Sequence, residues 1–131
     1  MRYTLRVAGR SNTILLVNDN PRWLKVLTER LKSMGFAVIP AHDGMEALKF
    51  VRENLPDIVI SDVVMPTING FELCRCIREI EITSKIPVIL FSNLDMSKEK
   101  LQRAKDAGAN AVLPGSPDLS ALLKTIRALT S

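Results

Sequence analysis

Five short apolar runs alternate along the chain with five amphipathic segments. The runs place Val, Ile and Leu on consecutive positions, which is typical of strands buried on both faces of a parallel sheet. In the segments between them, apolar residues recur every three or four positions, as on the buried side of a helix. The predicted strands are residues 13–17, 36–40, 56–62, 87–92 and 111–113, and a helix is predicted after each of them.

Residues that start or stop helices stand at the predicted boundaries. Asn20-Pro21, Asp43 and Ser97 are good helix N-caps, and Gly35 and Gly108 follow the ends of two helices. The third helix is expected from about Asn69 to Ile82, and Ser116-Pro117 opens the last one. Regular alternation of strands and helices predicts a doubly wound α/β fold with a five-stranded parallel sheet and helices on both faces.

The composition is that of one globular domain. The chain has 131 residues, of which 47% are hydrophobic and 24% are charged. No apolar run approaches the roughly 20 residues of a membrane helix, and the amino terminus has no signal-peptide core. We therefore expect a cytoplasmic protein with no membrane partner. Because the chain ends with the last helix, we expect no output domain.

The net charge of +4 comes mostly from the first twelve residues, which contain Arg2, Arg6 and Arg10 and no acid. The remaining chain is close to neutral, so the basicity is an amino-terminal arm and not a patch on the fold. No nucleic-acid partner is predicted. Residues 1–7 alternate as in a strand, and both an added edge strand and a disordered extension remain open.

The cysteines and the histidine carry no predicted chemistry. Cys74 and Cys76 lie two apart on a predicted helix, a spacing that cannot form a disulfide there, so we expect reduced thiols. His42 is the only histidine. Without a second ligand or a base partner, it is predicted to be structural or exposed.

A lone carboxylate, Asp62, ends the third strand and is the strongest candidate for function. In open α/β sheets, ligands bind in the crevice outside the carboxyl ends of the strands. Met65-Pro66 ends the strand, and Gly70 is expected to supply a flexible turn before the next helix. That helix begins too far downstream for Asp62 to be its cap.

Other polar residues follow the neighbouring strands and should gather at the same edge. These are Asn18-Asp19 after the first strand, Ser92 after the fourth and Gly115-Ser116 after the fifth. Mg²⁺ commonly takes one or two carboxylates, a carbonyl and several waters. Each residue could also be ordinary turn chemistry, but their convergence predicts a magnesium site.

Residues from about 13 to 130 resemble the receiver domain of bacterial response regulators. The best match is Asp62–Gly70, which follows the family pattern D-x-x-M-P-x-x-x-G, and further matches are Gly44, Ala47-Leu48, Pro87–Ser92 and Gly108-Ala109. The resemblance implies the flavodoxin-like receiver fold with strand order 2-1-3-4-5. We therefore expect a receiver domain at residues 13–131 behind a basic arm at residues 1–12.

The resemblance also implies roles for residues of the crevice. Asp62 would accept a phosphoryl group from the phosphohistidine of a histidine kinase or His-phosphotransfer protein. Asp19, Asp62 and the Val64 carbonyl would bind Mg²⁺, and Ser92 would be the switch residue that bonds the phosphoryl group. A downstream protein would bind the face of the fourth helix, fifth strand and fifth helix. A homodimer stays open.

The sequence departs from the family pattern at two positions. Asn18 replaces the first acid of the pair after strand one, so it is expected to bind the cation only weakly. Gly115 and Ser116 replace the lysine and cis proline after strand five, and the lysine would neutralise phosphoryl oxygens. Losing one carboxylate and one lysine together keeps the net charge of the site. Lys98 or Lys100 is an alternative source of the missing charge.

Two functions fit these residues. One is a single-domain, non-enzymatic phosphoacceptor in a two-component phosphorelay. The other is a pseudo-receiver, which binds a protein partner without being phosphorylated. A phosphohydrolase of the haloacid-dehalogenase type would need D-x-D after strand one, where this chain has Asn18-Asp19-Asn20. A flavin-binding loop and a Walker-type loop are likewise missing from the sequence.

Overall fold

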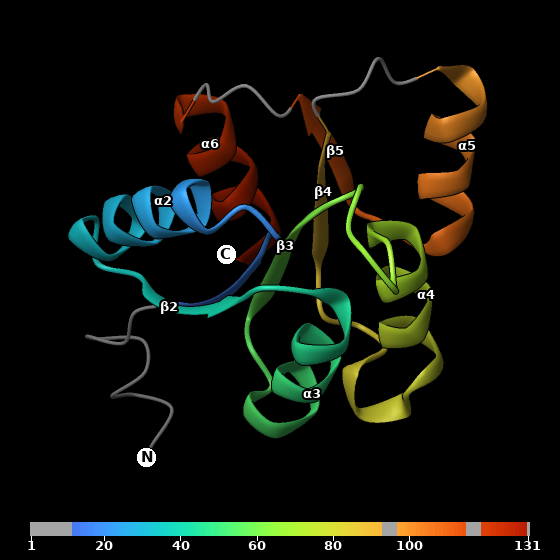
Figure 1. Ribbon diagram of the computed structural model, residues 1–131, viewed down its shortest axis with the longest axis horizontal. Coiled ribbons are helices and arrows are strands. Elements are labelled where there is room, and N and C mark those ends of the chain that lie inside the picture. Colours follow the sequence, from blue (N-terminus) through green and yellow to red (C-terminus); the bar gives the residue numbers. More distant parts are fainter. Residues whose placement is uncertain (1–11, 93–96, 115–118, 131) are drawn as a thin grey trace.

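The computed structural model describes residues 12–92, 97–114 and 119–130. Within them, five parallel strands form one sheet in the order β2-β1-β3-β4-β5 (Figure 1), which confirms the predicted fold and strand order. The strands are β1 (Thr13–Val17), β2 (Ala37–Ala41), β3 (Ile58–Asp62), β4 (Val88–Ser92) and β5 (Ala111–Pro114). The helices are α2 (Pro21–Ser33), α3 (Gly44–Asn54), α4 (Gly70–Glu79), α5 (Lys98–Ala107) and α6 (Leu119–Thr130), with a short 3-10 helix, η1 (Glu81–Thr83).

The sheet separates two apolar layers because successive side chains of a strand point to opposite faces. In β1, Leu15 and Val17 join the layer that α3, α4 and α5 cover. Ile14 and Leu16 join the layer that α2 and α6 cover. All four side chains are fully buried, so the central strands are enclosed on both faces, as their uninterrupted apolar runs predict.

The predicted caps start the helices where expected. The side chain of Asn20 accepts hydrogen bonds from two amides of the first turn of α2, and Asp43 and Ser97 each accept one at the start of α3 and α5. Asn69 and Glu72 form a reciprocal capping box at α4. Gly108 ends α5 in the left-handed conformation that favours glycine.

The third helix is shorter than the predicted range of residues 69–82. Its regular turns end at Glu79, Ile80 is extended, and η1 follows. The Thr83 hydroxyl donates to the carbonyl of Ile77 (2.8 Å) and replaces a helical backbone bond there. The apolar spacing of the sequence continues through this break and therefore could not reveal it. Smaller shifts place β2 one residue later than predicted and extend β5 to Pro114.

Pro40 lies on the open edge of the sheet. The backbone groups of Ala37 and Ala41 bond toward β1, through Asn12 (3.0 Å) and Asn18 (3.1 Å). Alternation then turns the backbone of Pro40 outward, and proline has no N–H to offer an added strand. This edge is therefore blunted against strand addition. Residues 1–11, for which an edge strand or an extension stayed open, lie outside the described residues.

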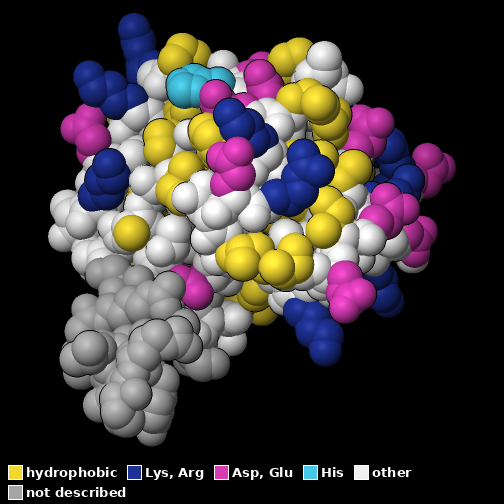
Figure 2. All heavy atoms as spheres, turned by 90° about the horizontal axis from the view of Figure 1, so that it is seen from below, with side chains coloured by type: hydrophobic (Ala, Val, Ile, Leu, Met, Phe, Trp, Pro, Cys, Tyr) yellow, Lys and Arg dark blue, Asp and Glu magenta, His cyan; other side chains and the backbone are white. Residues whose placement is uncertain are grey.

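The described surface in Figure 2 carries charges of both signs. Lys and Arg side chains lie among Asp and Glu, with small apolar patches between them, so this face has no area of a single charge sign. Within residues 12–92, 97–114 and 119–130, no helix is both long enough and apolar enough to cross a membrane.

Two buried threonines differ in hydrogen bonding and predict opposite effects of the same substitution. Thr28 on α2 is 8% exposed, and its hydroxyl has no hydrogen-bond partner among the described residues. Thr83 is fully buried with its hydroxyl bonded. We expect Thr28→Val to stabilise the fold by about 1 kcal/mol and Thr83→Val to destabilise it by a similar amount. Urea unfolding followed by circular dichroism tests both, and a loss of stability in Thr28→Val would contradict the assignment.

Candidate functional site

The ends of β1, β3 and β4 bring the predicted site residues to one edge of the sheet. Val17 pairs with Ser61, so Asn18 follows at the level of Asp62. Asp62 in turn pairs with Phe91, the residue before Ser92. The parallel register thus gathers the acidic loop, the lone carboxylate and the hydroxyl at one crevice. Gly115 and Ser116 lie outside the described residues.

Asn18 and Asn20 build the turn that presents Asp19. Asn18 is 7% exposed, and its side-chain oxygen accepts from the Asn20 amide at 2.8 Å. The Asn20 side chain caps α2 by accepting from the amides of Arg22 and Trp23, both at 3.1 Å. Turn chemistry therefore accounts for both asparagines, and one lone pair of the Asn18 oxygen is already used. Asp19, between them, is exposed.

Asp62 is half-buried, and its surroundings disfavour the ionised form of its carboxyl. Burial raises the pKa of its carboxyl, hydrogen bonds from the backbone of Val63 and Val64 lower it, and the negative charge of Asp19 raises it again. The net shift is upward. The ionised carboxylate is therefore less stable here than in water, and a cation or another positive group beside it would relieve the penalty.

The loop after β3 folds back tightly on the strand end. The Val63 amide donates to the Phe91 carbonyl (2.9 Å), and the Gly70 amide donates to the Val63 carbonyl (2.8 Å). Between them, Thr67 takes a positive φ of 64° while the Ile68 amide bonds the Pro66 carbonyl at 2.8 Å. The loop is thus held at both ends, and Val64 at its start is 54% exposed.

Gly70 is required for space and not for a flexible turn, which corrects the expectation from sequence. Its φ is not in the left-handed region; the strained residue of this loop is Thr67. A Cβ on residue 70 would lie 2.5 Å from the carbonyl oxygen of Asp62 and 2.9 Å from the Cα of Val63. Only glycine allows α4 to begin this close to the end of β3.

Ser92 is a buried hydroxyl at the end of β4, with 3% of its surface exposed. It pairs in register with Pro114, the last residue of β5. Lys98 and Lys100, the alternative positive groups, lie in the first turn of α5, which follows β4 in the chain.

The donor set suits a hard cation that keeps much of its own water. In the part of the chain that the structure describes, no three His, Cys, Asp or Glu side chains form a metal-binding group. The crevice instead offers two carboxylates, Asp19 and Asp62, with the Asn18 amide and the backbone of Val64 nearby. One or two carboxylates plus waters are the usual protein ligands of Mg²⁺. The residues present therefore fit Mg²⁺, with fewer charges than a site of three acids.

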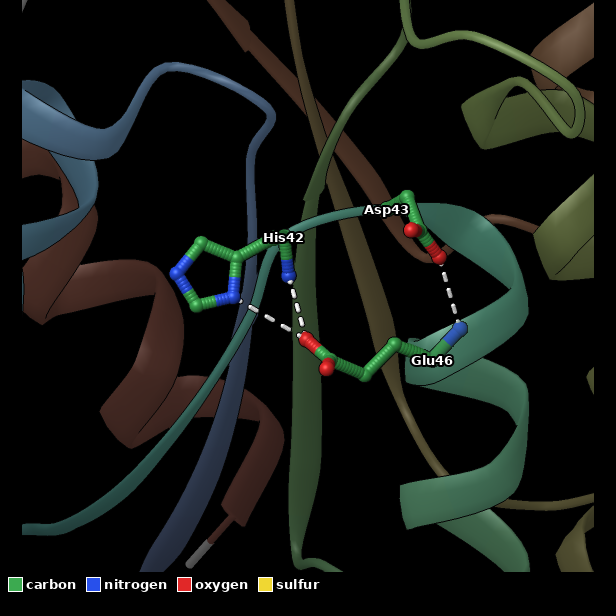
Figure 3. Close-up of polar contacts among 3 residues, drawn as sticks. All are labelled: His42, Asp43 and Glu46. Atoms are coloured by element: carbon green, nitrogen blue, oxygen red, sulfur yellow. Dashed lines mark hydrogen bonds and ion pairs between the residues drawn. The ribbon is translucent and has the colours of Figure 1, made fainter.

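His42 directly follows β2, and its hydrogen bonds go to Glu46 in the first turn of α3. Its Nδ1 is 3.1 Å from Glu46 Oε1, and its backbone amide donates to the same oxygen at 2.8 Å (Figure 3). Asp43 accepts from the Glu46 amide at 2.8 Å. This exposed cluster reinforces the start of α3, in agreement with the structural or exposed role predicted for His42.

The two cysteines are free thiols. Cys74 is buried on α4 and its Sγ donates to the Ala107 carbonyl at 3.3 Å. Burial raises the pKa of this thiol despite the opposing charges of Arg78 and Arg75. Cys74 is therefore a packing residue that links α4 to α5.

Comparison with known proteins agrees with this arrangement. Residues 14–127 match the family described as the response regulator receiver domain. The chain belongs to this family. Response regulator receivers are signalling modules of two-component systems, and receiver domains generally bind Mg²⁺.

Two known bacterial proteins are similar over most of this chain. Protein PilH of Pseudomonas aeruginosa is 37% identical over 116 residues, which cover 88% of this chain and 95% of PilH. The gliding motility regulatory protein of Myxococcus xanthus is 36% identical over 94% of this chain but only 16% of its own length.

Solved structures show the same fold. Chemotaxis protein CheY4 of Vibrio cholerae superposes with a TM-score of 0.85 at 30% identity, covering 91% of this chain and 98% of CheY4. The receiver domain of a sensor histidine kinase from Pseudomonas aeruginosa gives 0.83 at 25% identity, covering 92% and 98%. That domain has a magnesium ion coordinated in its active-site cleft.

The raised pKa of Asp62 predicts a pH-dependent gain of stability in Asp62→Asn. In the range between its unfolded and folded pKa values, the folded receiver binds more protons, so stability falls as pH rises through that range. Without Mg²⁺, Asp62→Asn should therefore be more stable than the wild type at pH 7. The difference should shrink as pH falls below the folded pKa of Asp62 and disappear once the carboxyl is protonated in both states. Urea unfolding at several pH values measures it.

Asp57→Asn is the matched control, because Asp57 precedes the same strand and accepts a hydrogen bond from the Thr13 amide at 2.7 Å. It should give no stabilisation at pH 7. A difference between Asp62→Asn and the wild type that is the same at every pH would show that the Asp62 charge is not the cause.

Proposed function

We propose that this receiver accepts a phosphoryl group on Asp62, with Mg²⁺ bound by Asp19, Asp62 and the Val64 carbonyl, weakly assisted by Asn18. Ser92 acts as the switch residue. In this proposal the receiver domain spans residues 13–131 behind a basic arm at residues 1–12, whose last residue, Asn12, bonds the sheet. The protein works in the cytoplasm as a receiver in a two-component phosphorelay.

The observation that carries this proposal is the half-buried carboxylate of Asp62 beside Asp19 in the crevice. Its ionised form is disfavoured by burial and by Asp19, and a carboxylate with a neighbouring acid is a natural ligand of a hard cation. When bound, Mg²⁺ supplies positive charge that offsets the incoming phosphoryl oxygens. The protein itself positions the Asp62 carboxylate. Backbone hydrogen bonds from Val63 and Val64 hold it, and the exposed Asp19 lies close enough to act on its charge.

The missing lysine should make this phosphorylation slow or incomplete. Gly115 has no side chain to donate to a phosphoryl oxygen, and a charge-assisted hydrogen bond of this kind contributes roughly 1.5–3 kcal/mol. The wild type therefore depends on the cation, Ser92 and backbone amides. Lys98 and Lys100 on α5 are the alternative donors.

The phosphodonor in this proposal is a histidine kinase or His-phosphotransfer protein, and a downstream protein binds the face of α5, β5 and α6. A shallow surface groove of about 410 Å³ lies along α6 on this face. It is lined by Leu119, Ser120, Leu123, Lys124 and Arg127. Nucleic acid and membrane are not partners in this proposal, and self-association into a homodimer is compatible with it.

A second candidate is the pseudo-receiver, a protein-interaction module that works without phosphorylation. The observation in its favour is that the Asn18 side-chain oxygen accepts a hydrogen bond from the Asn20 amide. An acid at this position would use its oxygens to bind the cation. Both candidates use the same fold, and only the chemistry of Asp62 separates them.

Labelling with acetyl phosphate and Mg²⁺, followed by phosphate-affinity electrophoresis, separates the two candidates. We expect slow labelling of the wild type, none of Asp62→Asn, and labelling about ten- to hundredfold faster in Gly115→Lys, from the energy of the restored bond. A failure of both the wild type and Gly115→Lys to label would favour the pseudo-receiver. Equal rates in these two proteins would show that the absent lysine has no effect.

A further inference from the structure

An edge-to-face aromatic contact joins the start of α2 to the end of β4. The rings of Trp23 and Phe91 have centroids 5.9 Å apart and an interplanar angle of 81°. This is a favourable aromatic geometry that adds to the energy of simple burial. Phe91 is 7% exposed, and Trp23 packs against the same apolar layer.

On the α2 side, this contact leads directly to the acidic loop. The Trp23 amide donates to the Asn20 side chain at 3.1 Å, and the Asn20 amide donates to the Asn18 side chain at 2.8 Å. Asp19 lies between these two asparagines. The position of the indole therefore fixes the first turn of α2 and, through it, the loop that carries Asp19.

On the β4 side, the contact leads to Asp62. Phe91 pairs with Asp62 in register. Ile60 and Phe91 belong to the same apolar layer, and Asp62, two residues after Ile60 in β3, faces the same side of the sheet. The Phe91 carbonyl also accepts from the Val63 amide at 2.9 Å. The ring is thus a direct cross-strand neighbour of the candidate phosphoacceptor, and Ser92 is the next residue of the chain.

We propose that Trp23 and Phe91 are positioning residues that brace the acidic loop against the ends of β3 and β4. The two carboxylates of the crevice lie on different segments, and this contact is a side-chain link between those segments outside the crevice itself. It couples cation binding at Asp19 and Asp62 to the conformation of the strand that ends in Ser92. This inference rests on the site assigned in the proposed function.

The test compares Trp23→Leu, Phe91→Leu, the double variant and a control. Phe36→Leu is the matched control, because Phe36 packs against the same apolar layer but precedes β2 at the opposite edge of the sheet. Two quantities are measured in each protein: the Mg²⁺ affinity by calorimetry, and the hydrogen-exchange protection of the Val63 amide by NMR.

We expect each single variant to lower Mg²⁺ affinity and Val63 protection by about two- to tenfold, the strength of an aromatic pair. The double variant should lose no more than either single variant, because one contact is removed in all three. Phe36→Leu should lower the melting temperature but leave the Mg²⁺ affinity unchanged, and it should lower Val63 protection by no more than its loss of global stability accounts for. The Trp23→Leu result is the sharpest, since Trp23 lies on α2 and contacts the ring of Phe91, whose carbonyl accepts from the Val63 amide.

Unchanged Val63 protection in Trp23→Leu, or additive losses in the double variant, would overturn the proposal. A wild type that binds no Mg²⁺ would overturn the metal site of the proposed function, while the exchange data would still decide whether the brace exists. A wild type that binds Mg²⁺ but is not labelled on Asp62 would reject phosphorylation and leave the brace standing.

Discussion

The backbone of Gly70 lies against the carbonyl of Asp62, and no side chain of any size fits between them. This contact lets the Gly70 amide bond the Val63 carbonyl at 2.8 Å and starts α4 directly beside the end of β3. A second glycine, Gly44, makes room for the same loop, since a Cβ there would lie 2.7 Å from the Ile68 carbonyl oxygen. Close packing at Gly70 therefore holds the backbone of Asp62 at the crevice, and packing at Gly44 supports the loop that follows.

The charges of the crevice follow from that position. Asp62 is forced into partial burial beside Asp19, and both effects raise the pKa of its carboxyl. A third acid at residue 18 would add to this repulsion. Residue 115 is a glycine and not a lysine, so it would supply no positive charge to offset the added acid. Asn18 instead uses its amide oxygen to hold the turn. This agrees with our proposal that the two departures from the family pattern are compensating changes in one electrostatic balance.

Much of this arrangement could be predicted from sequence, for identifiable reasons. Uninterrupted apolar runs mark strands covered on both faces, and Asn20, Asp43 and Ser97 cap helices through local hydrogen bonds that sequence spacing reveals. Asp62 stood out because a carboxylate at the end of a buried strand has few structural uses. These signals are local, and the structure confirms the fold that they imply.

The features that could not be predicted depend on three-dimensional contacts that the local sequence pattern does not reveal. The end of α4 at Glu79 depends on a side-chain hydroxyl that takes a helical carbonyl. The role of Gly70 depends on how closely α4 approaches β3, and glycine alone does not distinguish lack of space from a special φ. The Trp23–Phe91 contact joins residues 68 positions apart in sequence. Trp23 belongs to no motif, and Phe91 lies in the Pro87–Ser92 match only as one apolar residue of a strand.

The most direct test of the account is the Mg²⁺ affinity of Gly70→Ala, compared with that of Gly35→Ala. Gly35 has a φ of 99° with open space around it, so alanine there strains the backbone far from the crevice. Both variants should lose stability, but only Gly70→Ala should bind Mg²⁺ more weakly, by about tenfold, because Mg²⁺ requires near-octahedral geometry. Unchanged Mg²⁺ affinity in a folded Gly70→Ala would contradict the claim that this packing contact sets the geometry of the site.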